Sequence, residues 1–186
     1  MTDASATVTS SRLDLRPVRA EDLDELHVLH ADPEVWAHLP SGRHRTRERT
    51  AVDVEAYLAD WARDEMGYWT ARRLDDGAFV GIGGVRLRPT GVWNVYYRLS
   101  PAQQGQGFAV EIARAGLDAA ARLKPSAPVT AILLEHNTAS RRTAEKLGLS
   151  LAWRGPDAGN PNPEAVRLVY GDRVLDDEVL RRLVAR

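Results

Sequence analysis

The sequence contains no cysteine. This absence excludes disulfide bonds, thiolate nucleophiles and cysteine-ligated metal ions, and it is compatible with a reducing cytosol. No apolar run approaches the roughly 18 residues that a membrane span requires, and the first residues do not follow the pattern of a signal peptide. Composition therefore predicts a cytoplasmic protein with no membrane partner.

The sequence also lacks an excess of either charge. Its 25 Lys and Arg residues are balanced by 26 Asp and Glu residues, so the formal net charge is -1. A chain without a basic surplus gives no reason to expect a nucleic-acid partner. Four histidines, His27, His30, His38 and His44, lack the spacing and the accompanying carboxylates of a metal site. We predict no metal.

A length of 186 residues suits one domain with a buried core. The first stretch, MTDASATVTSS, consists of small and polar residues, and we predict that residues 1–11 form a flexible tail. No repeat or linker divides the rest of the chain. Residues 12–186 are therefore predicted to form a single domain.

Hydrophobic periodicity predicts an α/β fold with a mixed sheet. Alternation over 13–17 indicates a first strand, and helical stripes follow at 21–30 and after Thr46, which has the chemistry of an N-cap. The segments 67–74, 78–87 and 92–99 are separated by turn sequences and should pair as antiparallel strands. Further elements are expected as a helix from 108 to before Pro125, a continuous apolar strand at 129–135 buried on both faces, a helix at 137–148, strands at 149–153 and 164–171, and a helix at 175–186.

One loop between a strand and a helix has an unusual composition. The sequence PAQQGQGFAVE, residues 101–111, combines Gly105, Gly107 and Ala109 with an immediate helix start. Small residues let main-chain N–H groups approach a ligand, and a helix start adds unpaired donors and partial positive charge, which suits a pyrophosphate. A tight turn that needs glycine is the structural alternative. The spacing matches neither a P-loop nor a dinucleotide-binding fingerprint.

A second motif lies about thirty residues later. Gln104-x-x-Gly107-x-Ala109 is followed by Asn137-x-x-Ser140 and by the sequence AEKLG at 144–148. Together these motifs resemble the GCN5-related N-acetyltransferase (GNAT) family, and in particular its branch that acetylates the N-termini of ribosomal proteins. The resemblance extends over nearly the whole chain, including LRPVRAEDLDEL and FVGIGGV.

The resemblance implies a sheet that splays between two parallel strands, 92–99 and 129–135, with acetyl-CoA bound in the opening as co-substrate. The edge formed by Tyr97, Arg98 and Leu99 would bind the pantetheine arm, which Asn137 would also contact. The loop would hold the pyrophosphate. Its residues in that role are Gln104, Gly105, Gln106, Gly107, Phe108, Ala109 and Val110.

The resemblance also suggests catalytic residues. Many relatives carry a tyrosine where this chain has Ala144. The ribosomal-protein branch instead has a serine that matches Ser140, and the resemblance implies that Ser140 protonates the leaving thiolate. An acidic residue often begins the strand at the position of Asn94, which cannot accept a proton. Other candidates near the opening are Tyr96 on the strand, and Glu135 and His136 as proton acceptors, with a water chain as an alternative to any dedicated base.

The predicted activity is acetyl transfer from acetyl-CoA to a primary amine, either a protein N-terminus or a small molecule. In relatives, the acceptor is selected by the region that corresponds to residues 21–61. An acyl-CoA-binding sensor that has lost catalysis is the alternative, favoured by Ala144 and Asn94 and opposed by Ser140. Relatives are often dimers. Two alternatives therefore remain for the terminal helix: it forms a homodimer contact, or it packs on its own domain.

Overall fold

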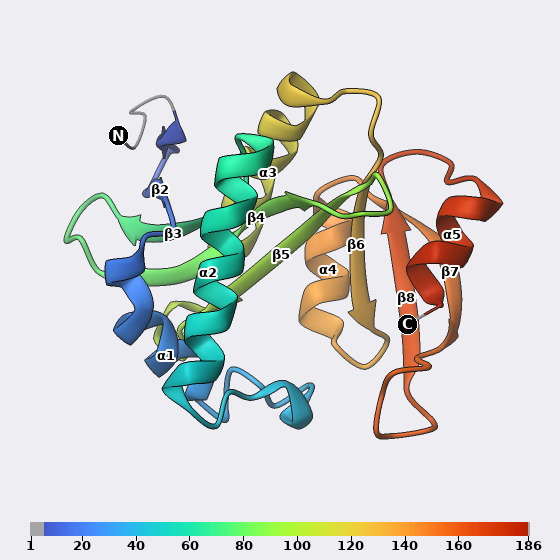
Figure 1. The fold of residues 1–186 in the computed structure, drawn as a ribbon, viewed down its shortest axis with the longest axis horizontal. Coiled ribbons are helices and arrows are strands. Elements are labelled where there is room, and N and C mark those ends of the chain that lie inside the picture. Colours follow the sequence, from blue (N-terminus) through green and yellow to red (C-terminus); the bar gives the residue numbers. More distant parts are fainter. Residues whose placement is uncertain (1–5, 186) are drawn as a thin grey trace.

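The computed structural model describes residues 6–185, which form one eight-stranded sheet with helices on both faces (Figure 1). The strand order across the sheet is β1-β2-β3-β4-β5-β6-β8-β7. The strands are β1 (Val8–Thr9), β2 (Leu13–Pro17), β3 (Tyr68–Arg73), β4 (Phe79–Leu87), β5 (Trp93–Leu99), β6 (Val129–Leu134), β7 (Ser150–Pro156) and β8 (Val166–Gly171). The helices are α1 (Leu23–Ala31), α2 (Arg47–Asp64), α3 (Phe108–Leu123), α4 (Thr138–Lys146) and α5 (Asp177–Val184). This is the mixed α/β architecture that the sequence predicts.

Side-chain caps fix where the helices begin. The Thr46 side chain accepts a hydrogen bond from the Arg49 main-chain N–H at the start of α2, and Asn137 accepts one from Ser140 at the start of α4. Each bond satisfies one of the donors that a helix start leaves unpaired. Gly148 follows α4 with a φ of +83°, the left-handed conformation that ends many helices. The structure confirms Thr46 as an N-cap, and α4 lies within the helix predicted at 137–148.

The sheet splits at its only parallel pair among the described strands. All other neighbours are antiparallel, whereas β5 and β6 run parallel and pair only at Trp93↔Val129 and Asn94↔Thr130. Beyond these two positions the strands diverge, as Figure 1 shows. The structure therefore confirms the predicted V-shaped opening, whose closed end lies at Asn94.

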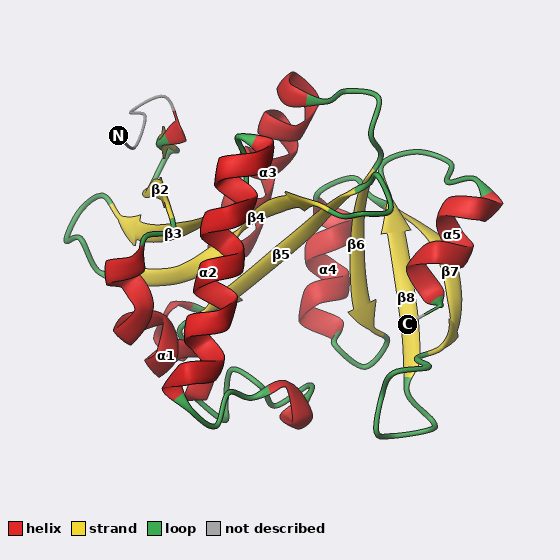
Figure 2. Cartoon of the chain, in the orientation of Figure 1, coloured by secondary structure: helices red, strands yellow, loops and turns green. Residues whose placement is uncertain are grey.

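Helices cover the two faces of the sheet differently (Figure 2). The cluster on one face joins α3 to β5 through Trp93, Val95 and Leu99, while the cluster on the other face joins α1 and α2 to Tyr96 and Ile82. Because side chains alternate along a strand, Tyr96 and Arg98 share the face that α1 and α2 cover. The segment between these two helices therefore lies over the opening.

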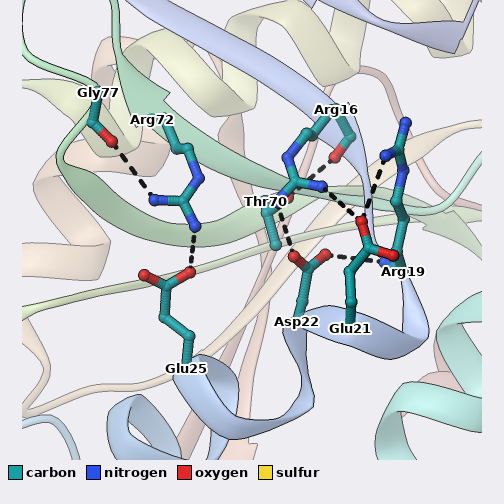
Figure 3. A network of polar contacts seen from close by, with 8 residues as sticks. All are labelled: Arg16, Arg19, Glu21, Asp22, Glu25, Thr70, Arg72 and Gly77. Carbon is teal, nitrogen blue, oxygen red and sulfur yellow. Dashed lines mark hydrogen bonds and ion pairs between the residues drawn. The ribbon is translucent and has the colours of Figure 1, made fainter.

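A polar network anchors the start of α1 to the sheet (Figure 3). Asp22, only 3% exposed, accepts hydrogen bonds from the Arg16 guanidinium at 2.7 Å and from the Arg19 main-chain N–H at 2.8 Å. One turn later, Glu25 forms an ion pair with Arg72 of β3. A buried carboxylate needs such partners, and here they fix the helix that precedes the α1–α2 segment.

Two sequence-based expectations need correction. The predicted flexible tail includes Val8–Thr9, which pair with β2, and Ser10 and Ser11, whose hydroxyls bond to Glu111. Residues 1–5 of that tail lie outside the described residues. In β6, Ile132 and Leu133 each pack against a core cluster but are only partly buried, because they also line a cavity at the opening.

Candidate functional site

Two cavities adjoin in the opening between β5 and β6. The first, here called the loop cavity, has a volume of about 350 Å³ and is lined by the glycine loop and α4. The second, the strand cavity, has a volume of about 280 Å³ and lies against β5, β6 and the β7–β8 hairpin. The residues common to both cavities are His38, Tyr97, Arg98, Asn137 and Ser140. A ligand bound in one cavity can thus meet a ligand bound in the other.

The glycine loop presents a row of unpaired donors. The main-chain N–H groups from Gly105 to Ala109 have no main-chain acceptor within residues 6–185, whereas the N–H of Val110 bonds back to Gly107. Gly105 and Gly107 have φ values of +75° and +84°, which residues other than glycine rarely adopt. The loop ends at the first residue of the 16-residue helix α3. This arrangement suits an anion such as a pyrophosphate.

Arg12 and Glu111 hold the loop from behind. Glu111 accepts hydrogen bonds from Ser10, Ser11 and Arg12, and Arg12 also donates to the carbonyl of Gln106 at 3.0 Å. Burial alone would raise the pKa of Glu111, but these hydrogen bonds lower it below its ordinary value. The carboxylate thus stays ionised at neutral pH and keeps Arg12 in position against the loop.

The open side of β5 offers main-chain hydrogen bonds to an extended ligand. Trp93 directs its N–H toward the β6 side, where it bonds to Pro128 at 2.8 Å, so by alternation Tyr97 and Leu99 face the same way. The splay leaves no strand beside these two residues. One carbonyl there, that of Leu99, accepts from the Gln104 side chain at 3.2 Å. An extended amide-containing chain fits this edge as an added strand.

Of the predicted catalytic residues, Ser140 and Tyr96 face the cavities. Ser140 lines both, and its carbonyl accepts a hydrogen bond from the Tyr97 hydroxyl at 3.3 Å. Burial raises the pKa of Tyr97, so this hydroxyl stays protonated at neutral pH. Tyr96 lines the strand cavity, and its hydroxyl accepts from Arg98 at 2.8 Å and contacts His30 at 3.3 Å.

Glu135 and His136 line neither of the two cavities. Glu135 pairs with Arg154 through contacts of 2.6 and 3.0 Å, and these hydrogen bonds lower the pKa of its carboxyl. His136 donates from Nε2 to the carbonyl of His38 at 2.8 Å, which requires the proton on that nitrogen. Neither side chain lines a cavity together with Ser140. Their role as bases stays a prediction.

Two predicted loop residues are turned away from the loop cavity. The Gln106 side chain bonds to the carbonyl of Ala102, and the Phe108 ring is buried in the core, 3% exposed, beneath the guanidinium of Arg12. Only their main-chain N–H groups remain available to a ligand. The other predicted binding residues line the loop cavity, namely Tyr97, Arg98, Leu99, Gln104, Gly105, Gly107, Ala109, Val110 and Asn137.

Comparison with known proteins identifies the family. Residues 12–150 match the model of the acetyltransferase (GNAT) domain. The chain belongs to the GNAT acetyltransferase family. Acetyl-CoA is therefore its co-substrate.

Relatives support this membership over most of the chain. The uncharacterized protein YkkB of Bacillus subtilis is 28% identical over 84% of this chain and 95% of its own length. The FsC-acetyl coenzyme A-N(2)-transacetylase of Aspergillus fumigatus is 30% identical over 79% of this chain and 66% of its own length.

Solved structures share the fold. A GNAT-family acetyltransferase from Bacillus anthracis aligns with a TM-score of 0.73 at 19% identity, covering 89% of this chain and 96% of its own. RimL, a ribosomal L7/L12 alpha-N-protein acetyltransferase in complex with coenzyme A, aligns with a TM-score of 0.73 at 20% identity, covering 91% and 98%. The recognised branch of ribosomal-protein acetyltransferases thus lies among the structural neighbours.

Sequence reasoning missed two basic residues of this GNAT site. Arg142 and Lys146 line the loop cavity one helical turn apart on α4, beside the glycine loop. Cations in that position suit the phosphates of coenzyme A. Lys146 lies within the AEKLG motif, but the motif alone does not tell which side of the helix meets the loop.

Sequence reasoning also missed His38, Asp157 and Arg167, which line the strand cavity. They come from the α1–α2 segment and the β7–β8 hairpin, which are far apart in the sequence, so no local pattern connects them. Burial, followed by the charge of Arg98, lowers the pKa of His38 to about 4. Its imidazole is therefore neutral at physiological pH.

Within residues 6–185, no cluster of three His, Asp or Glu side chains could hold a metal ion. No helix in the same range is both long and apolar enough to cross a membrane.

Proposed function

We propose that this GNAT acetyltransferase transfers the acetyl group of acetyl-CoA to the nitrogen of a primary amine. The observation that carries the proposal is the pair of adjoining cavities, one beside the glycine loop and one beside β6 and the β7–β8 hairpin, which meet at Tyr97, Asn137 and Ser140. The names of two similar proteins, an N(2)-transacetylase and an alpha-N-protein acetyltransferase, support nitrogen as the acceptor atom.

In the loop cavity, the acetyl donor would be held mainly by the main chain. The free N–H groups from Gly105 to Ala109 would bind the pyrophosphate, with Arg142 and Lys146 beside it. The pantetheine arm would extend along Tyr97 and Leu99. Because Gly105 has no atom within 4 Å of an added Cβ, the space above the loop is open to such a ligand.

The amine nitrogen attacks the thioester carbonyl carbon, a C–N bond forms, and the C–S bond then breaks. Ser140 would supply a proton to the thiolate that leaves, so that free coenzyme A carries a thiol. The attacking nitrogen, positively charged once the C–N bond has formed, would release one proton to solvent, and Ser140 would recover its own proton from solvent. Ser140 lines both cavities, and its side chain lies within hydrogen-bonding reach of the Tyr97 hydroxyl, which also donates to the Ser140 carbonyl. The N–H of Leu99 would stabilise the oxyanion.

The ammonium form of the acceptor must lose a proton before it attacks. His38 lines both cavities, and neither of its ring nitrogens bonds to another described residue. With a pKa of about 4, this imidazole is too weak a base to retain the proton at neutral pH. It would instead accept a hydrogen bond from the neutral amine and orient it, while the proton passes to solvent.

The test combines calorimetry with product analysis. We expect acetyl-CoA and coenzyme A to bind and ATP not to bind, and we expect mass spectrometry to detect N-acetylated product from a panel of small amines and peptides. Binding of acetyl-CoA without turnover of any amine would contradict the proposal and favour the alternative, a non-catalytic acyl-CoA sensor. If neither acetyl-CoA nor coenzyme A binds, the assignment of the site is overturned altogether.

One observation bears on that alternative. In the sequence, the sensor hypothesis is favoured by Asn94, which stands where relatives often have an acidic residue. Asn94 lines neither cavity, because it lies where β5 and β6 still pair. The replacement of that acidic residue by an amide thus leaves the side chains around the meeting point of the cavities intact.

A further inference from the structure

The guanidinium of Arg98, which lines both cavities, forms no ion pair with a carboxylate of residues 6–185, although Glu34 also lines the loop cavity. Arg98 donates from Nε to the Tyr96 hydroxyl at 2.8 Å and from one terminal nitrogen to the carbonyl of Val35 at 3.1 Å. Both acceptors are neutral. The other terminal nitrogen makes no hydrogen bond to a described residue, although Arg98 lines both cavities.

The position of this guanidinium is fixed by packing. Its central carbon lies 3.4 Å from the centre of the Trp36 ring, a close cation–π contact. Trp36 is itself buried, and its indole N–H donates to the carbonyl of His30 at 2.7 Å. A side chain that is held by two hydrogen bonds and a ring loses little further entropy when it binds a ligand. Arg98 is thus a preorganised anion-binding group.

The other charges in the strand cavity neutralise one another. Asp157 pairs with Arg167 and also accepts from Asn160 at 3.0 Å. The remaining titratable side chains that line it are Tyr96, Tyr97 and His38, and His30 contacts the Tyr96 hydroxyl. Burial, with a smaller effect of the Arg98 charge, lowers the pKa of His38 to about 4 and that of His30 to about 3. The cavity therefore carries the positive charge of Arg98 alone.

A positive cavity is a poor environment for an acceptor that arrives only as an ammonium ion. We propose that Arg98 binds a carboxylate of the acceptor, so that the substrate is a compact amine bearing a carboxylate, such as a free amino acid. This inference rests on the proposed function and names its substrate class. Guanidinium binds carboxylate through two parallel N–H donors, and the terminal nitrogens of Arg98 still have donors to offer.

The experiment compares acceptors that differ only in this charge. Free α-amino acids and their C-terminal amides are offered to the intact protein with acetyl-CoA, and kcat/KM is measured for each pair. We expect the carboxylate form to be preferred by about 10- to 100-fold, the range for a hydrogen bond to a charged group. The Arg98→Gln variant should lose this preference, and Arg98→Lys should restore part of it.

Arg142→Gln is the matched control, because this arginine lines only the loop cavity. It should weaken acetyl-CoA binding and leave the ratio between acid and amide unchanged. Equal or better use of amides by the natural protein would overturn the carboxylate assignment while leaving N-acetylation intact. If Arg98→Gln weakens acetyl-CoA binding as much as it weakens use of the acid, Arg98 belongs to the donor site. Absence of any acetylated amine would overturn both proposals.

Discussion

The two cavities of the candidate site are built largely from different parts of the chain. The loop cavity combines main-chain N–H groups from one short segment, residues 105–109, with one face of the next helix, α4, and with Glu34, Val35 and His38 of the α1–α2 segment. The strand cavity uses side chains from the α1–α2 segment, β5, β6 and the β7–β8 hairpin. A site formed by the main chain can be recognised from a local sequence pattern, since glycine is needed at fixed positions. A site formed by side chains from distant segments has no such local pattern.

The largest expected effect comes from the glycine loop. Gly107→Val should lower acetyl-CoA affinity by about 100-fold or more, because at least two hydrogen bonds to a charged group would be lost. Gly107 has a φ of +84°, and an added Cβ would lie 3.6 Å from the Arg12 guanidinium. Calorimetric titration gives the affinity, and thermal unfolding shows whether the fold persists.

Gly91→Val provides the matched control. Gly91 has a similar φ of +81°, has no atom within 4 Å of an added Cβ, and lies in the turn between β4 and β5. It should carry a comparable backbone strain of about 1–2 kcal/mol and bind acetyl-CoA normally. If both variants bind equally well, the loop does not hold the donor.

A second effect separates catalysis from donor binding. Ser140→Ala should lower kcat by about 100-fold, the scale of losing a general acid, and should leave acetyl-CoA affinity within about twofold. Thr138→Ala is the control, since Thr138 is on the same helix but exposed and outside both cavities. An unchanged rate would move the proton-donor role to the Tyr97 hydroxyl, which bonds to the Ser140 carbonyl.

A smaller effect tests the charges beside the loop. Lys146→Glu should weaken acetyl-CoA binding by about 5- to 10-fold, and added salt should reduce the difference, because these charges are partly exposed and screened. Lys124, the other lysine of the sequence, lies past the end of α3 and outside both cavities. Lys124→Glu should bind acetyl-CoA like the natural protein. Equal loss in the two variants would indicate a general effect of net charge.

The smallest effect concerns Glu135. Glu135→Gln should change kcat/KM by less than about twofold between pH 6 and 9, since its carboxylate is engaged by Arg154 and lies outside both cavities. The pH–rate profile is the measurement. Loss of a limb of that profile, together with a tenfold lower rate, would instead assign Glu135 as the base.

Much of the fold follows from local patterns. Alternation predicts β2 to β5, the positions of Thr46 and Asn137 predict two helix starts, and the apolar run at 129–135 predicts β6. The short strand β1 escaped prediction because Val8–Thr9 pair through main-chain bonds, while the serines beside them bond to a residue about a hundred positions away.

The candidate site could be predicted where a local motif or the alternation of a strand marks it, which includes Tyr96, Asn137 and Ser140. The motif at 104–109 indicates the glycine loop, and Asn137 and Ser140 follow from the second motif. Nothing near His38, Asp157 or Arg167 in the sequence indicates that they share a cavity. Their proximity depends on how the α1–α2 segment folds over β5 and on the return of the β7–β8 hairpin.

The splay after Asn94 gives the protein a sheet edge in the middle of its sheet. Strand edges with unpaired N–H and C=O groups are templates for pairing with other chains, and Tyr97 and Leu99 form such an edge. Without its donor, the protein should therefore show rapid amide hydrogen exchange at these two central residues. A bound pantetheine arm would occupy the place of the missing strand. Added acetyl-CoA should therefore reduce aggregation of the stored protein.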